Sequence, residues 1–207
     1  MSQPDLDRLA LSPSDATGYT VKAVEGKGAP VDHGFLTRYS TVTPASCRPI
    51  YAAAELRSLH DFTAHVSEDV MSSADTMASH ASISLTSYTD SDARNVLSEL
   101  RFALSQCTTA AIRPSAARPG DELGYSSPYQ RTAPGAGDDA IGFNASQVIV
   151  GVNGPVIPMT VMVVRKGSTV ATFKTLDPTD EYPSIPKDIL DTQLKKLAAD
   201  PSPPAQV

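Results

Sequence analysis

The sequence lacks several features that would assign a function directly. It has no tryptophan and only two cysteines among 207 residues. No apolar run approaches the roughly 20 residues that a membrane-spanning helix needs. A basic segment followed by an apolar one, the pattern of a signal peptide, is also missing. We therefore expect no membrane-spanning helix.

Proline and glycine are absent from one continuous block of the chain. All 17 prolines and all 12 glycines lie outside residues 50–113. Because both residues interrupt regular elements, the block is expected to be the most regular part of the molecule. The length is that of one domain, which we expect to span residues 1–200, with a flexible tail at 201–207.

The sequence also lacks motifs for the common cofactor-dependent chemistries. There is no nucleotide-binding glycine loop, no zinc-protease motif and no nucleophile elbow. The 23 acidic side chains outnumber the 17 basic ones, and the basic residues form no stripe that could follow a phosphate backbone. We therefore predict no cofactor, no metal and no nucleic-acid partner.

Periodicity within the block predicts a helix, a strand and a second helix. Apolar residues spaced three or four apart predict an amphipathic helix over 56–70. Alternation over 81–86 predicts a strand with one buried face. A further apolar stripe predicts a helix that begins near Ser91 and ends at Cys107.

The second half of the chain predicts a long loop and then a series of strands. Residues 114–137 show no usable period and are expected to form a loop. Closely linked strands are expected within 139–176, and a terminal helix over 185–199. These strands are predicted at 140–143, 148–152, 160–164 and 169–173. The order indicates an α+β fold: a central antiparallel sheet with helices packed on one face and a cleft.

The two cysteines border the proline-free block. Cys47 precedes it, and Cys107 lies on the apolar stripe of the second predicted helix. They lack the spacing of a redox pair or a zinc site, which leaves two buried thiols or one disulfide. We favour the disulfide, which would indicate an oxidising compartment.

Several separated segments resemble one family, the extracellular sensor domains of mycobacterial-type receptor serine/threonine kinases and related secreted lipoproteins of actinobacteria. The similar segments are Leu9–Lys22, the positions of Cys47 and Cys107, Gly137–Ala140, Val163–Gly167 and Gln193–Leu197. The resemblance implies an α+β fold, a cleft for a small ligand, and export, commonly with a lipid anchor. The chain departs from the family in having too few cysteines for a second disulfide.

Two groups of acidic residues suggest chemistry but have simpler interpretations. In the first predicted helix, Asp61, His65 and Glu68 share the face opposite the apolar stripe, which is typical of a solvated surface. Asp138 and Asp139 are adjacent at a strand start and would point to opposite faces, so we expect a solvated strand end.

The predicted loop carries the candidate ligand-binding residues. Tyr125, Tyr129 and Arg131 together offer ring faces and a charged donor that suit an apolar or anionic ligand. The leading hypothesis is an exported, extracellular or cell-envelope domain that binds a small ligand without catalysis. The alternative is an enzyme, of cyclase or isomerase type in a secondary-metabolite pathway, that uses the same cleft as an apolar pocket.

Overall fold

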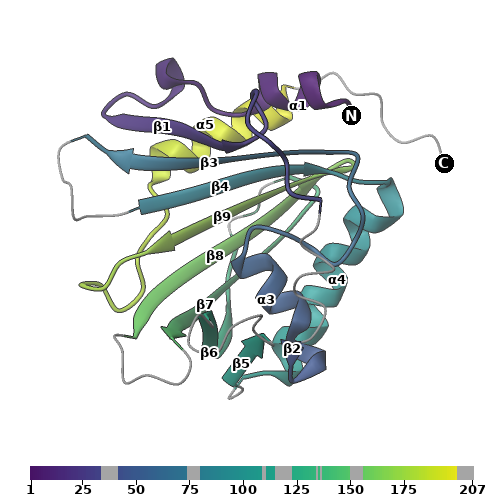
Figure 1. The fold of residues 1–207 in the computed structure, drawn as a ribbon, viewed down its shortest axis with the longest axis vertical. Coiled ribbons are helices and arrows are strands. Elements are labelled where there is room, and N and C mark those ends of the chain that lie inside the picture. Colours follow the sequence, from purple (N-terminus) through teal and green to yellow (C-terminus); the bar gives the residue numbers. More distant parts are fainter. Residues whose placement is uncertain are drawn as a thin grey trace.

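A nine-stranded antiparallel sheet organises the molecule (Figure 1). The computed structural model describes residues 1–33, 42–73, 80–108, 111–114, 123–133, 135, 137–149 and 156–199. The sheet has the order β1-β3-β4-β9-β8-β7-β6-β5-β2. Its strands are β1 (Tyr19–Glu25), β2 (Val42–Thr43), β3 (Ala64–Ser72), β4 (His80–Ser87), β5 (Ala111–Pro114), β6 (Leu123–Arg131), β7 (Asp139–Ile149), β8 (Ile157–Lys166) and β9 (Thr169–Leu176).

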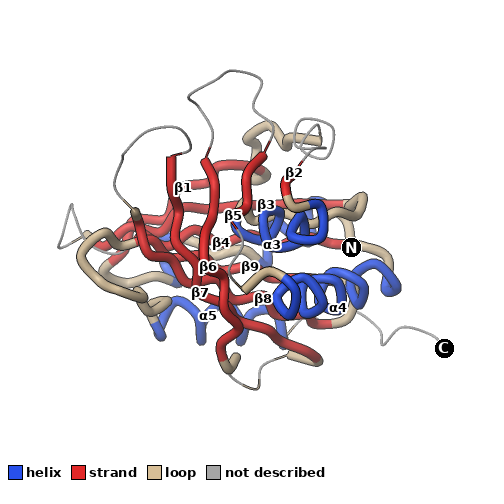
Figure 2. Tube along the Cα trace, turned by 90° about the horizontal axis from the view of Figure 1, so that it is seen from below, coloured by secondary structure: helices blue, strands red, loops and turns tan. Residues whose placement is uncertain are grey.

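Helices cover the sheet in two separate groups, so the α+β class with a central antiparallel sheet is confirmed. They are α1 (Gln3–Leu9), α3 (Arg48–Ala54), α4 (Asp90–Gln106) and α5 (Lys187–Ala198), with 3₁₀ turns η1 (Pro13–Asp15) and η2 (Ala45–Cys47). Figures 1 and 2 show α3 and α4 over one part of the sheet and α1 and α5 over another. None of the described helices combines the length and apolarity needed to cross a bilayer.

Strand alternation sends apolar side chains into two cores. On β8, Val161 and Val163 enter the core beneath α3 and α4, whereas Val164 enters the core beneath α1 and α5. On β4, Ile83 and Leu85 join the α1/α5 core. Successive side chains of a strand point to opposite faces, so helices cover both faces of the sheet and not only the one face that we expected.

The predicted helix within the second half of the proline-free block is confirmed as α4. Its N-cap is Thr89, two residues before the expected cap at Ser91. The Thr89 hydroxyl accepts a hydrogen bond from the Asp92 amide at 3.1 Å. The predicted stripe, including Leu97 and Leu100, is buried against α3 and the sheet. The expected strand over 81–86 and the terminal helix are likewise present as β4 and α5.

The predicted helix over 56–70 is wrong. Helix α3 ends at Ala54, Leu56 has a φ of +60°, and the chain then continues as strand β3. A non-glycine residue in the left-handed region does not continue an α-helix. The block therefore contains a helix, two strands, a second helix and the start of β5. His65 and Glu68, expected on a solvated face, are both buried.

The region 114–137 is also more regular than predicted. Strand β6 occupies much of it, and β7 is one strand where the sequence suggested two. β6 keeps its proline, Pro128, at an irregularity in the pairing with β7, as expected for proline in a strand. Residues 150–152 of the strand expected at 148–152 and the tail at 201–207 lie outside the described residues.

Candidate functional site

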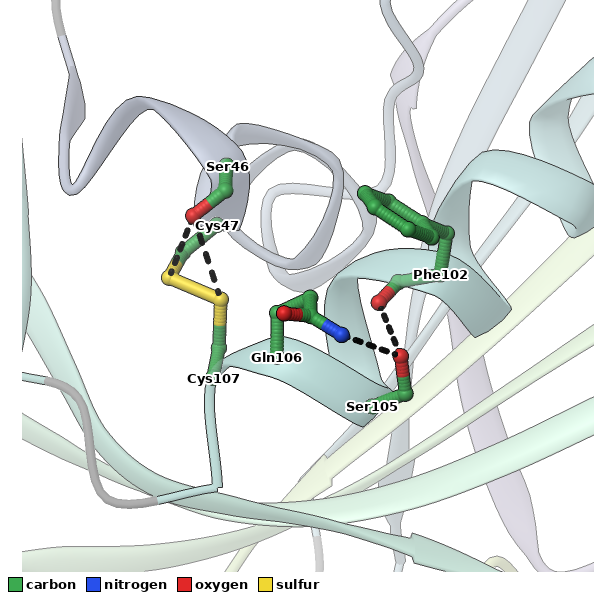
Figure 3. The surroundings of a disulfide bond; sticks show 6 residues. All are labelled: Ser46, Cys47, Phe102, Ser105, Gln106 and Cys107. Carbon is green, nitrogen blue, oxygen red and sulfur yellow. Dashed lines mark hydrogen bonds between the residues drawn. A yellow bond between two sulfur atoms is a disulfide. The ribbon is translucent and has the colours of Figure 1, made fainter.

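A disulfide joins the two cysteines and fixes one end of α4 (Figure 3). Cys47 and Cys107 have Cα atoms 5.9 Å apart, and both side chains are buried. Cys47 ends η2, directly before α3, and Cys107 is the C-cap of α4. The predicted pairing is confirmed, and it ties α3 to α4 on the same face of the sheet.

Tyr125 is fully buried in the core beneath α3 and α4. Its ring meets the edge of the Tyr51 ring at a centroid distance of 5.5 Å. Its hydroxyl donates a hydrogen bond to the Glu55 carboxylate, just after α3. Tyr125 therefore anchors β6 to α3, and its ring is not exposed to solvent.

Tyr129 and Arg131 meet around a buried amide on the opposite face of the sheet. The Asn144 amide nitrogen donates to the Tyr129 hydroxyl at 2.8 Å, and Arg131 donates to the Asn144 carbonyl at 3.3 Å. Thr160 donates to the same carbonyl at 3.0 Å. The Tyr129 ring stands against the Tyr182 ring and is 39% exposed. The arrangement presents an aromatic edge and a guanidinium to solvent.

A bulge in β6 separates Tyr125 from Tyr129. In a regular strand, residues four apart lie on the same face. Here Ser126 pairs with Ser146 and Tyr129 with Asn144, so β6 contains one extra residue, and Ser127 has a φ of +50°. A bulge of one residue exchanges the two faces for the rest of the strand. The structure therefore brings Tyr129 and Arg131 together but places Tyr125 apart from them.

A histidine that the sequence assigned to a helix surface lies buried on β3. The His65 ring has its Nδ1 2.8 Å from the Thr86 hydroxyl and its Nε2 3.3 Å from a Glu25 carboxylate oxygen. The same carboxylate is paired with Arg57. Burial lowers the pKa of His65 below its usual value, although Glu25 favours the charged ring. The positive charge of Arg57 acts in the same direction as burial.

A second row of polar side chains lies on the face of the sheet that carries His65, further along β3, β4 and β9. Lys174 on β9 lies opposite Ser82 of β4, which donates to Asp69 of β3 at 2.9 Å. Burial lowers the pKa of the Lys174 ammonium, and Glu55 and Asp69 act in the opposite direction. Polar residues thus fill the part of this face that α4 leaves uncovered, a pattern that the alternating serines of β4 could have indicated.

The adjacent aspartates at the start of β7 hold two different partners. Asp138 accepts from the Gly167 amide at 2.7 Å and from Lys166 at 2.9 Å. Asp139 forms an ion pair with Arg101 of α4. Hydrogen bonds from these partners keep the pKa of both carboxyls below the usual range. Both groups are therefore carboxylates that position β7 rather than bases poised to take a proton.

The whole fold is similar to a known extracellular domain. It matches the crystal structure of the extracellular domain of PknH from Mycobacterium tuberculosis with a TM-score of 0.58 and 13% sequence identity. The match covers 97% of this chain and 98% of that one. The sequence matches no family model and no curated protein. The two chains share a fold, in agreement with the fold that the sequence resemblance implies.

Proposed function

We propose that this chain is an exported, sensor-like domain that binds a small ligand and catalyses no reaction. The observation that carries the proposal is the fold, which corresponds over nearly its whole length to an extracellular domain. The Cys47–Cys107 disulfide supports the same compartment, because disulfides persist in oxidising surroundings. The location proposed is extracellular or at the cell envelope, with membrane attachment through a lipid anchor.

The ligand contact is assigned to Tyr129 and Arg131 on the outer face of β6. Both side chains are exposed, and Asn144 holds both through its amide. An exposed ring beside a guanidinium suits a ligand that has an apolar part and an acceptor. Tyr125 has a supporting role in this proposal, because it is buried and fixes β6 to α3.

Native mass spectrometry of protein isolated from its source without reduction tests the proposal. The expected mass is lower by two hydrogens than that of the dithiol, and it includes a non-covalent small-molecule adduct. Arg131→Gln is expected to lose the adduct, whereas Arg94→Gln, an exposed arginine on α4, is expected to retain it. Two free thiols with an unprocessed N-terminus would contradict export, and an adduct equally retained by both variants would contradict this ligand surface.

A further inference from the structure

A groove lies on the outer side of α4, away from Tyr129 and Arg131. It has a volume of about 530 Å³ and separates the start of α3 from the middle of α4. Its lining includes Arg48, Pro49, Leu59, His60, Glu99 and Phe102. The volume falls within the range of small-molecule sites, roughly 300–1,000 Å³. The lining combines apolar surface with one arginine, one histidine and one glutamate.

Phe102 is the apolar side chain that the fold leaves most open. It is 65% exposed, the largest exposure among the large hydrophobic side chains of the described residues. The residues of α4 that pack on the sheet, such as Leu100 and Leu104, are buried, and Phe102 is not on their stripe. Figure 3 shows its ring standing out from α4. Phe102 therefore adds nothing to the core and is available to an apolar ligand surface.

Arg48 supplies a donor that no described residue accepts. Its Nε is buried and has no hydrogen-bond acceptor among the described residues. The nearby acids have another partner: His60 places Nδ1 3.3 Å from Asp92 and Nε2 3.2 Å from Glu99. A buried donor without an acceptor is unfavourable, and a guanidinium binds a carboxylate through paired hydrogen bonds. The groove is therefore complementary to an anion at its Arg48 side.

The walls of the groove are held together covalently. Cys47 precedes Arg48 directly, and Cys107 closes the helix that carries Phe102. The disulfide thus limits movement between the apolar wall and the guanidinium. A site whose walls are already in place loses less conformational freedom when a ligand binds.

We propose that this groove binds a small organic acid, with its apolar or aromatic body against Phe102, Pro49 and Leu59 and its carboxylate on Arg48. The site is independent of the function proposed above, because it involves other residues on the opposite face of the sheet. A groove of this size accommodates a single small molecule, and the basic group at one side requires an anionic end.

The absence of tryptophan from the sequence allows a direct test. Phe102→Trp places the single tryptophan of the chain in the groove, and 4-phenylbutyrate serves as the probe. We expect a saturable change in tryptophan emission. The uncharged 4-phenylbutanamide is expected to bind at least about tenfold more weakly, as expected for loss of a charge-assisted hydrogen bond. Val24→Trp, an exposed position on β1, is expected to give no saturable change.

Two further substitutions in the Phe102→Trp background separate binding from folding. Arg48→Gln is expected to weaken 4-phenylbutyrate binding about tenfold while leaving amide binding unchanged, a selective effect that misfolding would not produce. Arg94→Gln, on the same helix as Phe102, is expected to change neither affinity. The proposal would be overturned if Phe102→Trp bound 4-phenylbutyrate and 4-phenylbutanamide equally well. It would also be overturned if adding Arg48→Gln did not weaken the binding of 4-phenylbutyrate. A tryptophan emission that changes with protein concentration, and not with added 4-phenylbutyrate, would likewise contradict the proposal, because the groove would then be a contact between copies of this chain.

Discussion

The two cores on opposite faces of the sheet are stabilised by different kinds of interaction between the elements around them. The α3/α4 core is closed by the Cys47–Cys107 disulfide. In the α1/α5 core, Glu68 pairs with Lys27 at 2.6 Å and accepts from the Leu11 amide at 2.9 Å. One core is thus held by a covalent bond and the other by charged hydrogen bonds.

Polar and charged side chains of α5 bind the main-chain carbonyls at the C-terminal end of α1. Gln193 of α5 donates to the Leu9 carbonyl at 2.9 Å, and Lys196 donates to the Ala10 carbonyl at 2.8 Å. Carbonyls at a helix C-terminus lack partners within the helix and favour cationic donors. Lys196 also pairs with the Asp15 carboxylate. Reduction should therefore weaken one core, and protonation of Asp15 in acid should weaken the contacts of the other.

The largest expected effect is loss of the disulfide. Replacing both Cys47 and Cys107 with alanine opens a loop with a sequence separation of 60 residues. Loop-closure entropy predicts a loss of about 4 kcal/mol in the free energy of unfolding. Urea unfolding of the double variant measures it, and reduction of the parent protein should have a similar effect. A loss below about 1 kcal/mol would show that packing of α3 on α4 alone closes this core.

The next largest effect is expected at Glu68, in the other core. Glu68→Gln leaves the half-buried Lys27 ammonium without its buried counter-charge, and we expect a loss of about 2 kcal/mol. Burial raises the pKa of Glu68 despite Lys27, so the pair itself is costly to desolvate. The double change Glu68→Gln with Lys27→Met should therefore recover part of the loss, as a double-mutant cycle in urea would measure.

A surface pair provides the control for Glu68. Asp191→Asn breaks the exposed pair with Lys187 and should change stability by no more than about 0.5 kcal/mol. If Glu68→Gln were equally mild, the ion pair would not be what closes the α1/α5 core.

The sequence predicted well those elements whose local pattern and tertiary environment agree. Helix α4 has one apolar stripe and packs by it, and β4 alternates Ile83 and Leu85 with serines. The border positions of Cys47 and Cys107 were sufficient to predict their pairing, because few alternatives fit two isolated cysteines. In each case a local signal had one consistent interpretation.

β3 was not predictable because burial of charge interrupts its pattern. Ala64, Val66 and Val70 share one face of this strand, but the intervening position on that face is Glu68. A charge at a core position suggests a solvated helix face. The Lys27 ammonium, 41 residues away, and the Leu11 amide, 57 residues away, make it tolerable. Long-range pairing of this kind has no local signal.

The candidate ligand residues were only partly predictable for a related reason. Tyr125, Tyr129 and Arg131 are close in sequence, and a regular strand would have placed them on one face. The single extra residue near Ser127 reverses that geometry. Pro128 was visible in the sequence and marks the bulge, but it was equally compatible with the loop that we expected.

The smallest of the three expected losses concerns acid and Asp15, where Lys196 of α5 meets the N-terminal segment. Hydrogen bonds from Lys196 at 2.6 Å and from Ser12 lower the pKa of Asp15 to about 2. Because the folded pKa lies below the ordinary 3.8, the stabilisation is complete above that value and is lost as pH falls towards 2. After solvent screening, we expect it to be about 1 kcal/mol.

Asp15→Asn isolates this contribution from the other carboxylates. Urea unfolding of the parent and the variant should differ by about 1 kcal/mol at pH 6 and converge as the pH approaches 2. The Cys47→Ala, Cys107→Ala variant should show the same convergence when Asp15→Asn is added to it, because Asp15 pairs with α5, which covers the other core. If the difference disappeared in the absence of the disulfide, the two cores would be coupled through the sheet rather than closed independently.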